Sequence, residues 1–586
     1  MAFPFEANYP TFTYSTATGY LSQNWNIFGP SSGANQPVYY LVLEPLAIGD
    51  VMTGKLLPWL ATNWTFVNGT HDLVVYLRHD VYFYYKGSWT ILMYLNPQIY
   101  MNQKEFNVTW LNGTTIQILW LFTAKDVIAT FQDYFKVYGN PYGISVKEIN
   151  LYEVQFHFKY PNVQYALYTI LTQLIVPWEE YANLSDPSSA NIQVLIGTGP
   201  YYLSYFSPGK VILDRNPYYW IPGRPLLEKV IFYVAPNQQE GYEMLSKGQV
   251  QWGGFDAIGP IPPSQLFTSK NPRYYHEILS VVNGTPAGEP TFLFINYNRL
   301  NYWPWNESWF RLAISLAINR TQVSLAATGT PLGEPPTPAT FLPFPMEMEW
   351  LNSTTIQEAS LVDQFNPSEA LMILEKHGFY IADGFLHFPN GSLFPPVTIL
   401  GYSGFPDNYY AELTIASDLQ KFLGLSVSLE STNNAAQRAI DIITGNYDLV
   451  LIPIGLYSPA IIWGSAFIPP LIPGTDEPNI TAIKSNTPLL TDWGRWIPPK
   501  EFIDLYLKAL NITNSDELKE IYNKMAMILI KEIPAIPAVE IDFPRYQYED
   551  NLYIGFPIQE FFYTWNVEPY YEPLLLVLNL APRPAG

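Results

Sequence analysis

Residues 197–220, GTGPYYLSYFSPGKVILDRNPYYW, join a glycine-rich turn, a strand and an aromatic-rich turn. The two glycines and the proline of GTGP predict a tight turn, after which the chain runs back antiparallel to the preceding segment. The segment RNPYYW, residues 215–220, predicts a turn that is capped by Asn216 and carries three aromatic side chains. We interpret this stretch as structural, because its glycines set the backbone path and its aromatic residues are suited to filling a core.

Outward from this stretch, helical and strand patterns alternate along the chain, and Pro-rich connections such as residues 331–345 separate them. This alternation favours an α/β architecture over an all-α or all-β one. Thr123 is expected to cap the helix that begins at Ala124. We expect helices over residues 39–46, 124–137, 238–245, 309–317, 366–378 and 411–423, and strands over residues 73–78, 211–214, 229–234, 291–297, 397–400, 424–429 and 447–453.

The composition excludes several classes of protein. The chain has 586 residues, no Cys, and 51 acidic against 30 basic residues, which gives a formal net charge of −21. The absence of Cys excludes a disulfide scaffold, a thiolate nucleophile and a Cys-ligated metal. The negative charge would repel phosphate backbones, so nucleic acid is not an expected partner.

Charged residues make up only 14% of the chain, so neutral polar groups must cover much of the surface. This low charge density suits an acidic medium, a hypothesis that a loss of stability below about pH 4 would contradict. Asn-x-Ser/Thr triplets predict a glycosylated extracellular protein, although a composition rich in Asn and Thr also produces such triplets. They begin at Asn63, Asn68, Asn107, Asn112, Asn183, Asn283, Asn306, Asn319, Asn352, Asn390, Asn479 and Asn511.

The chain shows neither a secretory leader nor a membrane span. Residues 1–10, MAFPFEANYP, lack a charged segment followed by an apolar one, and the most apolar stretch, residues 525–539, is interrupted by Lys531. We expect any leader or membrane tether to lie outside these residues.

Four blocks of sequence motifs occur in order along the chain. The blocks are EPL (44–46) with KLLPWLA (55–61), LRHDVYF (77–83) and TAKDV (123–127); GTGPY (197–201) with RNPYYW (215–220); NYN (296–298) with RLAISLAINR (311–320); and GLSV (424–427) with GNYDL (445–449). With these motifs the chain resembles the large extracellular solute-binding proteins of ABC importers, family 5, which include receptors for oligopeptides, dipeptides, nickel and cello-oligosaccharides.

The resemblance implies an α/β, two-lobed, periplasmic-binding-protein-like fold that closes on its ligand by hinge motion. Lobe one is then discontinuous, with residues 1–37, 193–289 and 533–586, and carries an extra subdomain at residues 38–192. Lobe two spans residues 290–532, and two hinge crossings lie near Pro290 and Ile533. The implied protein is a monomer without a cofactor or an enzymatic reaction, and its partners are a small-molecule ligand and a membrane permease.

Two charged residues in the matching blocks have a structural interpretation. Arg311 is expected to anchor a helix end rather than to bind ligand. Asp448 lies in a strand expected to be buried, where a lone carboxylate needs a partner, so the sequence leaves open whether its role is structural.

The sequence favours an oligosaccharide as the ligand. Peptide receptors of this family commonly carry an acidic residue after the strand that ends the fourth block, whereas residues 454–463, IGLYSPAIIW, contain none. Sugar receptors stack aromatic rings on pyranose faces while amides bind the hydroxyl groups. Candidate ligand-binding residues, each of which could instead pack in the core or cap a turn, are Trp25, Asn26, Trp252, Gly253, Trp303, Trp305, Tyr402, Asp407 and Trp463.

Three alternatives remain at this stage. An oligopeptide or dipeptide receptor of the same family is the first. A secreted glycoside hydrolase is a remote second, since it needs two facing carboxyl groups and no motif indicates such a pair. A nickel receptor is the third, and no metal site is expected, because the six His (His71, His79, His157, His276, His377 and His387) show no ligand spacing.

Overall fold

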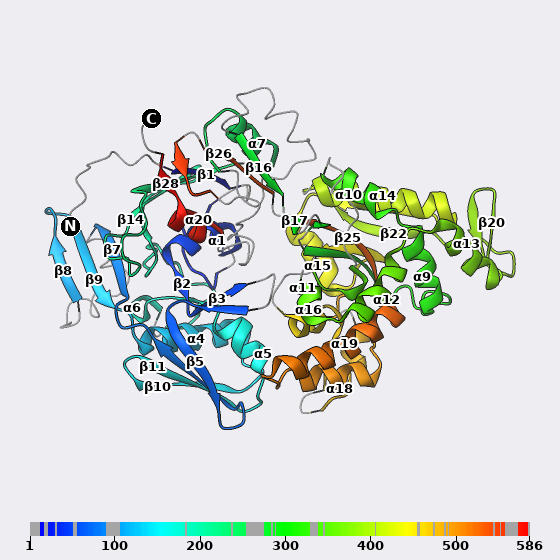
Figure 1. Ribbon diagram of the computed structural model, residues 1–586, viewed down its shortest axis with the longest axis horizontal. Coiled ribbons are helices and arrows are strands. Elements are labelled where there is room, and N and C mark those ends of the chain that lie inside the picture. The colour runs from blue at the N-terminus through cyan, green and yellow to red at the C-terminus, as the bar shows by residue number, and fades with distance from the viewer. Residues whose placement is uncertain are drawn as a thin grey trace.

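The computed structural model has two lobes, which stand side by side in Figure 1, and the first and last described strands, β1 (Phe12–Thr16) and β28 (Ala581–Pro582), both lie in the first lobe. The structure describes residues 12–16, 21–29, 32–50, 55–88, 106–181, 184–235, 238–252, 275–279, 281–282, 285–286, 289–328, 338–343, 346–404, 406–453, 458–472, 475–485, 488–489, 491–542, 545–550, 552–556 and 572–583.

The first lobe is built on a four-stranded sheet in the order β1-β15-β14-β13, in which β1 is parallel to β15 and the other pairs are antiparallel. Its core also contains Trp25, Trp252 and residues of the first and last helices. The elements are β1 (Phe12–Thr16), α1 (Ser32–Val42), β13 (Tyr201–Ser207), β14 (Lys210–Arg215), β15 (Lys229–Val234), α7 (Gln238–Ser246), β27 (Tyr553–Ile554), α20 (Glu572–Asn579) and β28 (Ala581–Pro582).

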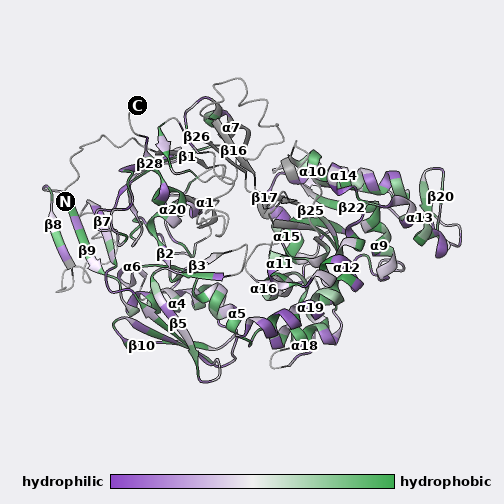
Figure 2. Ribbon diagram, in the orientation of Figure 1, coloured by the Kyte–Doolittle hydropathy of each residue, from purple (hydrophilic) through white to green (hydrophobic). Residues whose placement is uncertain are grey.

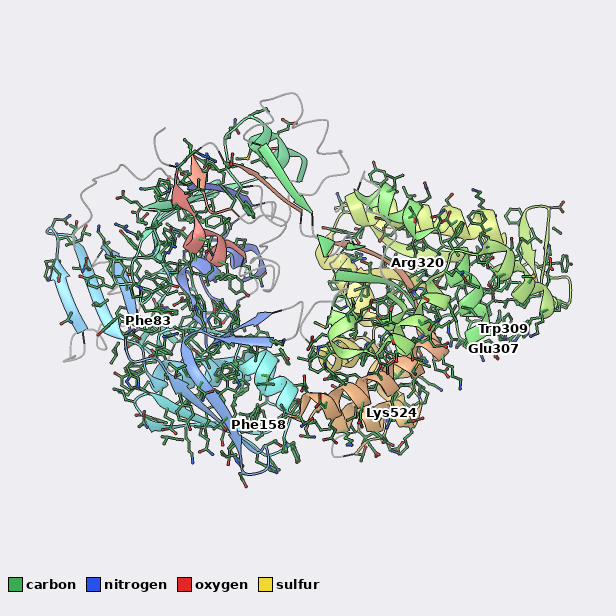
Figure 3. All side chains as sticks on the ribbon, in the orientation of Figure 1. Phe83, Phe158, Glu307, Trp309, Arg320 and Lys524 are labelled. Carbon is green, nitrogen blue, oxygen red and sulfur yellow. The ribbon has the colours of Figure 1, made fainter. Side chains whose placement is uncertain are left out.

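A subdomain with its own hydrophobic core extends the first lobe. Its sheets have the orders β10-β11-β6-β5 and β7-β9-β8, and Phe83 and Phe158 lie within it (Figure 3). Its elements are β2 (Glu44–Pro45), β3 (Ala47–Asp50), β4 (Lys55–Pro58), β5 (Ala61–Val67), β6 (Asp72–Leu77), β7 (Tyr82–Ser88), β8 (Phe106–Trp110), β9 (Thr115–Leu121), α4 (Ala124–Tyr138), β10 (Ile144–Asn150), β11 (Glu153–Phe158), α5 (Val163–Tyr165), η1 (Ala166–Ile170), β12 (Leu174–Ile175) and α6 (Trp178–Tyr181).

The second lobe surrounds a five-stranded sheet in the order β23-β22-β24-β19-β25. The strands are β19 (Glu289–Ile295), β22 (Val397–Tyr402), β23 (Val427–Thr432), β24 (Leu449–Pro453) and β25 (Ala535–Asp542), with a hairpin of β20 (Tyr380–Ala382) and β21 (Phe385–His387) at the edge of the lobe. The helices are α9 (Ser308–Ala317), α10 (Arg320–Thr328), η2 (Pro338–Thr340), α11 (Met346–Trp350), α12 (Ser353–Asp363), α13 (Pro367–Lys376), α14 (Pro406–Leu423), α15 (Ala435–Thr444), α16 (Pro459–Phe467), α17 (Ile480–Lys484), α18 (Lys500–Ala509) and α19 (Ser515–Glu532).

Strand β19 is buried on both faces. Leu293 and Ile295 belong to one hydrophobic core, whereas Phe292 and Phe294 belong to the core on the opposite face of the sheet. Successive side chains of a strand point to opposite faces, so a strand covered on both sides needs a continuous apolar run. Helices α14, α18 and α19 instead alternate between hydrophilic and hydrophobic residues along their length (Figure 2).

Most of the predicted elements are confirmed, although several have different bounds; α14, for example, begins five residues before the expected start. Thr123 caps α4 as expected, through a capping box with Asp126. The helix expected over residues 39–46 is wrong in its second half, because α1 ends at Val42 and β2 follows. Proline has no N–H and disfavours a helical residue before it, which accounts for the extended backbone at Glu44 and Pro45. The strand expected from Gly424 starts only at Val427.

The first two blocks of the resemblance meet around one buried carboxylate, that of Glu44. Trp59 Nε1 and Tyr219 Oη donate hydrogen bonds to Glu44 Oε1 at 2.8 and 2.9 Å, and Thr198 Oγ1 and Trp220 Nε1 donate to Oε2 at 2.8 and 3.1 Å. Asn216 caps its turn through the Tyr218 N–H, as predicted. This Glu44 cluster joins the subdomain to the sheet of the first lobe.

Gly197 and Gly199 allow the backbone of this turn to lie against the end of α1. The Gly199 N–H donates to the Val42 carbonyl oxygen at 2.9 Å. A Cβ atom on Gly197 would lie 1.7 Å from that same oxygen, a distance that no side chain permits. The glycines of GTGPY are therefore required by close packing of two backbone segments.

The polypeptide passes between the lobes between β16 (Tyr275–Leu279) and β19, and again between β25 and β26 (Arg545–Glu549). Strands β16 and β26 pair with each other, as do β19 and β25. The sheet of the second lobe thus extends through Asp542. The expected domain limits stay a prediction.

Two buried arginines of the second lobe donate hydrogen bonds to backbone carbonyl oxygens of other segments of that lobe. Arg311 donates to the carbonyl oxygens of Trp305 and Ile533 at 2.8 and 2.9 Å, so it anchors a helix end as expected. Arg320, which lies inside the second lobe (Figure 3), donates to the carbonyl oxygen of Asp363 at 2.7 Å.

Asp448 has a structural role, which settles the question that the sequence left open. It accepts a hydrogen bond from the Thr398 N–H at 3.1 Å and pairs with Arg299 at 3.0 Å.

Candidate functional site

The two lobes touch directly at the base of the space between them, where α5 lies beside α18 (Figure 1). The Val163 N–H donates to the Leu510 carbonyl oxygen at 2.6 Å across the boundary. The Ser458 hydroxyl, which also caps α16, donates to Gln164 Oε1 at 2.8 Å, and both side chains are buried. These contacts join the two lobes directly, at a place separate from the two segments by which the polypeptide crosses between them.

Above these contacts lies a cavity of about 580 Å³ with walls from both lobes, which we call the interlobe cavity. Aromatic rings face it from each side. Trp64, Phe66 and Tyr168 come from the subdomain, and Trp350 and Tyr522 come from the second lobe. This volume is typical of a small-molecule site, and opposed aromatic walls suit a ligand with ring-shaped apolar faces.

Trp350 and Tyr522 form one unit, with ring centroids 5.4 Å apart in an edge-to-face arrangement. The indole Nε1 of Trp350 is buried, and within the described ranges it has no hydrogen-bond partner. A buried donor without a partner is costly, so a ligand oxygen at this position would remove the penalty. Burial raises the pKa of Tyr522, so its hydroxyl stays protonated at neutral pH.

Three charged side chains also line the interlobe cavity. Lys519 and Glu349 form an ion pair at 3.7 Å, and each is about 40% exposed, so their charges largely cancel at the rim of the cavity. Lys55, the third, lies on the subdomain. The aromatic walls and the Gln164–Ser458 pair leave the interior mostly neutral.

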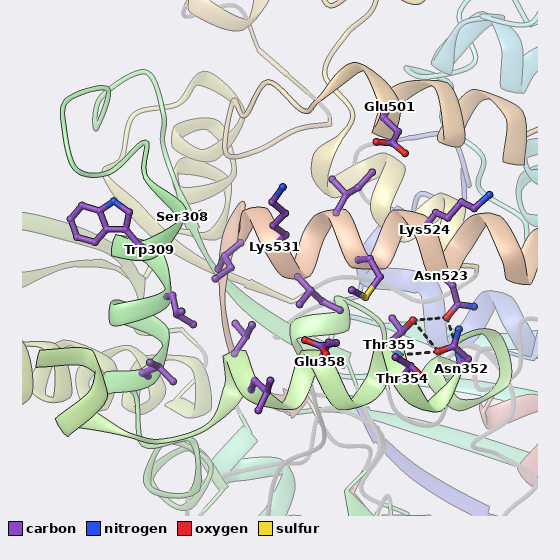
Figure 4. A pocket seen from close by; sticks show the side chains of 18 of the residues that line it. Ser308, Trp309, Asn352, Thr354, Thr355, Glu358, Glu501, Asn523, Lys524 and Lys531 are labelled. Carbon is purple, nitrogen blue, oxygen red and sulfur yellow. Dashed lines mark hydrogen bonds between the residues drawn. The ribbon is translucent and has the colours of Figure 1, made fainter. Parts of the chain in front are cut away.

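A larger groove, of about 1080 Å³, lies on the second lobe between α9, α12 and α19 (Figure 4). At one end, Asn523 ties the two long helices together by accepting from the Asn352 N–H and the Thr355 hydroxyl at 2.9 and 2.7 Å. All residues that line this groove belong to the second lobe, so closure of the lobes does not enclose it. For that reason we take the smaller interlobe cavity as the candidate site.

The candidate residues of the first lobe lie away from the described walls of the interlobe cavity. Trp25 and Trp252 are at most 1% exposed, and Trp252 stacks on Phe556 at 6.0 Å. Asn26 binds the carbonyl oxygens of Pro187 and Ala190. Both rings pack against protein, so in this conformation neither presents a free face to a ligand. Gly253 lies outside the described residues.

The candidates of the second lobe are scattered. Trp305 is buried against Phe310, while Trp303 is 42% exposed and packs on Phe379. Tyr402 is the last residue of β22, which runs two residues beyond the expected strand, and the Arg438 guanidinium lies 5.7 Å from its ring centroid.

The last two of these candidates lie within helices α14 and α16. Asp407 stands in the first turn of α14, and its side chain lies outside the described residues. Trp463 donates to the Thr340 carbonyl oxygen and packs edge-to-face behind Tyr522, which lines the cavity. For all nine candidates, a role in ligand binding stays a prediction.

Sequence reasoning missed Trp350, Tyr168 and Gln164. Trp350 follows two glutamates in MEMEW, which is typical of an exposed helix, and Tyr168 lies in an apolar run that resembles a core segment. The one available signal was the unusual polarity of Gln164 within NVQYALY, since a glutamine among apolar residues needs a buried partner.

Neither a metal site nor a membrane span is found. Within the described ranges, His, Asp and Glu do not gather in any group that could hold a metal ion. In the same part of the chain, every helix is too short or too polar to cross a bilayer.

Comparison with known proteins identifies the family. The family model of bacterial extracellular solute-binding proteins, family 5, matches residues 106–464, which is more than half of the chain. The chain belongs to this family. The family and fold expected from the sequence are thereby confirmed, and this family 5 protein is a substrate-binding receptor of an ABC transporter, not an enzyme.

Relatives and solved structures agree with this assignment. The probable ABC transporter periplasmic-binding protein SapA of Escherichia coli is 24% identical over 89% of this chain and 87% of its own. The fold resembles that of a periplasmic oligopeptide-binding protein of Thermotoga maritima, with a TM-score of 0.75, 21% identity and coverage of 98% and 99% of the two chains. The mannohexaose-bound structure of that protein gives a TM-score of 0.72 at 20% identity, covering 99% and 100%.

Proposed function

We propose that this family 5 receptor works outside the cytoplasmic membrane as a monomer, captures a neutral oligosaccharide in the interlobe cavity and delivers it to a permease. The observation that carries the proposal is the pairing of aromatic walls from both lobes around one cavity. Rings stack on the apolar faces of sugars, while N–H and hydroxyl groups bind the sugar oxygens. Hinge closure would bring the two walls onto one ligand.

Two further observations support a neutral ligand. The Lys519–Glu349 ion pair leaves the cavity without a large net charge. The mannohexaose bound to the Thermotoga maritima protein indicates that a similar fold accommodates a hexasaccharide. None of the predicted glycosylation sites that the structure describes has a buried asparagine, although attachment of sugars stays a prediction.

A peptide is the second candidate ligand. Lys55 and Glu349 line the same cavity and carry the opposite charges that the two ends of a peptide require. A relative from Salmonella typhimurium, 24% identical over 85% of this chain, is named a peptide transport periplasmic protein.

A thermal-shift screen separates the two candidates. We expect neutral oligosaccharides of two to six sugars to raise the melting temperature, because a ligand present at 100 times its Kd stabilises the folded state by about 2.7 kcal/mol. Short peptides with free termini are expected to leave it unchanged. A shift with peptides alone would make the oligosaccharide proposal wrong and support the peptide alternative.

We expect Trp350→Phe to weaken binding of the saccharide found in that screen by about tenfold, since the variant keeps an aromatic ring but loses the N–H donor. Calorimetric titration measures the change. Trp110→Phe is the matched control, because Trp110 is 54% exposed on β8 of the first lobe. Equal affinities for the Trp350 variant and the unmodified protein would remove this indole from the site.

A further inference from the structure

A second cavity, of about 360 Å³, lies inside the first lobe next to the interlobe cavity. Helix α1 contributes Gln36, Tyr39 and Tyr40 to its wall. Tyr168 lines both cavities, so the two spaces are neighbours that share this side chain. We call this space the tyrosine chamber.

The lining of the tyrosine chamber is aromatic and polar but uncharged. Four tyrosines, two glutamines and two threonines line it, together with Ile27 and Leu174, and the described lining contains no charged side chain. Burying an ionised carboxylate or ammonium group without a counter-charge is strongly unfavourable. The chamber is therefore suited to a neutral group that offers hydroxyl groups and an apolar face, which is the chemistry of a sugar ring.

The local backbone places these groups. Residues 166–170 form a π-helical turn, η1, in which the Leu171 N–H donates to the Ala166 carbonyl oxygen at 3.2 Å. Such turns are rare and occur frequently at functional sites. Here the turn carries Tyr168 and Thr169 into the chamber wall. On the opposite side, Tyr138 ends α4 at the rim, 56% exposed, with its ring edge-on to Phe28 at 6.4 Å.

We propose that the tyrosine chamber binds a terminal sugar ring of the oligosaccharide whose remaining units lie in the interlobe cavity. This inference rests on the proposed function and adds a subsite that selects for ligand length. The volume lies near the lower end of the roughly 300–1,000 Å³ typical of small-molecule sites, so the chamber has room for one end of a ligand only.

The test compares saccharides of increasing length on Tyr138→Ala and Gln36→Leu. Calorimetric titration uses the series from disaccharide to hexasaccharide on the full chain. For the unmodified protein, affinity should rise once the saccharide is long enough to enter the chamber. In each variant, the affinity for these longer saccharides should be about tenfold lower than in the unmodified protein, which is the effect expected for one lost aromatic or hydrogen-bonding partner. The shortest saccharides should bind as tightly as before.

Tyr205→Ala is the control, because Tyr205 is 50% exposed on β13 and does not line either cavity. The melting temperature of each variant without ligand shows whether it is folded, and two variants on different helices guard against a local folding defect. If the affinity of both variants depended on saccharide length as in the unmodified protein, the proposed subsite in the tyrosine chamber would be wrong, while the effect of Trp350→Phe would still support the proposed function. If no saccharide bound the unmodified protein, both the subsite and the proposed function would be wrong.

Discussion

Replacing Glu44 with alanine is expected to lower the free energy of unfolding by at least about 4 kcal/mol. The carboxylate of Glu44 is fully buried and accepts hydrogen bonds from four side chains on three different segments. Its removal leaves Trp59, Thr198 and Tyr219 as buried donors without an acceptor, and it also opens a cavity. Because these segments join the subdomain to the first lobe, the loss affects both.

Urea denaturation followed by tryptophan fluorescence measures this effect. Glu44→Gln keeps the shape of the side chain but places N–H groups against N–H and O–H donors, so we expect an intermediate loss of stability. Glu148→Ala is the matched control, since Glu148 is an exposed carboxylate on β10 of the same subdomain. If Glu44→Ala shifted the denaturation midpoint no more than Glu148→Ala, the Glu44 cluster would not stabilise the contact between the subdomain and the first lobe.

The protein is expected to lose stability by a few kcal/mol as the pH rises from 5 to 8. Burial raises the pKa of Glu44, Asp126 and Asp363 to about 7 each. Burial also raises the pKa of Glu180 and Asp492 well above the usual range. A carboxyl group whose pKa is higher in the folded state contributes stability below its unfolded pKa, and that contribution is lost as the pH rises through its folded pKa.

Denaturation midpoints measured at intervals across this pH range check the prediction, and Asp363→Asn is the diagnostic variant. An amide of the same shape removes one titrating group, so the pH dependence should become shallower. Asp72 has the opposite effect on the pH dependence of stability. Hydrogen bonds from His157 and Asn68 outweigh its burial and lower its pKa, so its contribution to stability is lost only in strong acid. A midpoint that rises towards pH 8 would contradict the prediction, and a collapse below about pH 4 would contradict adaptation to an acidic medium.

The elements of the fold were largely predictable because their signals are local. The cap at Thr123, the helix start at Asn366 and the apolar run of β19 each lie within a few residues of the element that they define. A contact between distant segments has no such local signal. Strand β25 pairs with β19, some 240 residues earlier in the chain, and so continues the sheet of the second lobe through Asp542.

The candidate site was not predictable in the same way. Its walls come from residues near positions 65, 165, 350, 458 and 520, which only the contact between the two lobes brings together. The residue type alone does not tell whether a tryptophan packs in a core, as Trp252 does, or lines a cavity, as Trp350 does. Trp252 is fully buried, whereas Trp350 is partly exposed and lines the cavity, and this difference depends on the tertiary structure.

A crystal structure of the protein with the saccharide that gives the largest thermal shift tests the central claim most directly. We predict electron density for the ligand in the interlobe cavity, with a sugar oxygen within hydrogen-bonding distance of Trp350 Nε1 and rings stacked between Trp64 and Trp350. Density for the ligand only in the groove between α12 and α19, or only on an outer surface of one lobe, would contradict capture between the lobes.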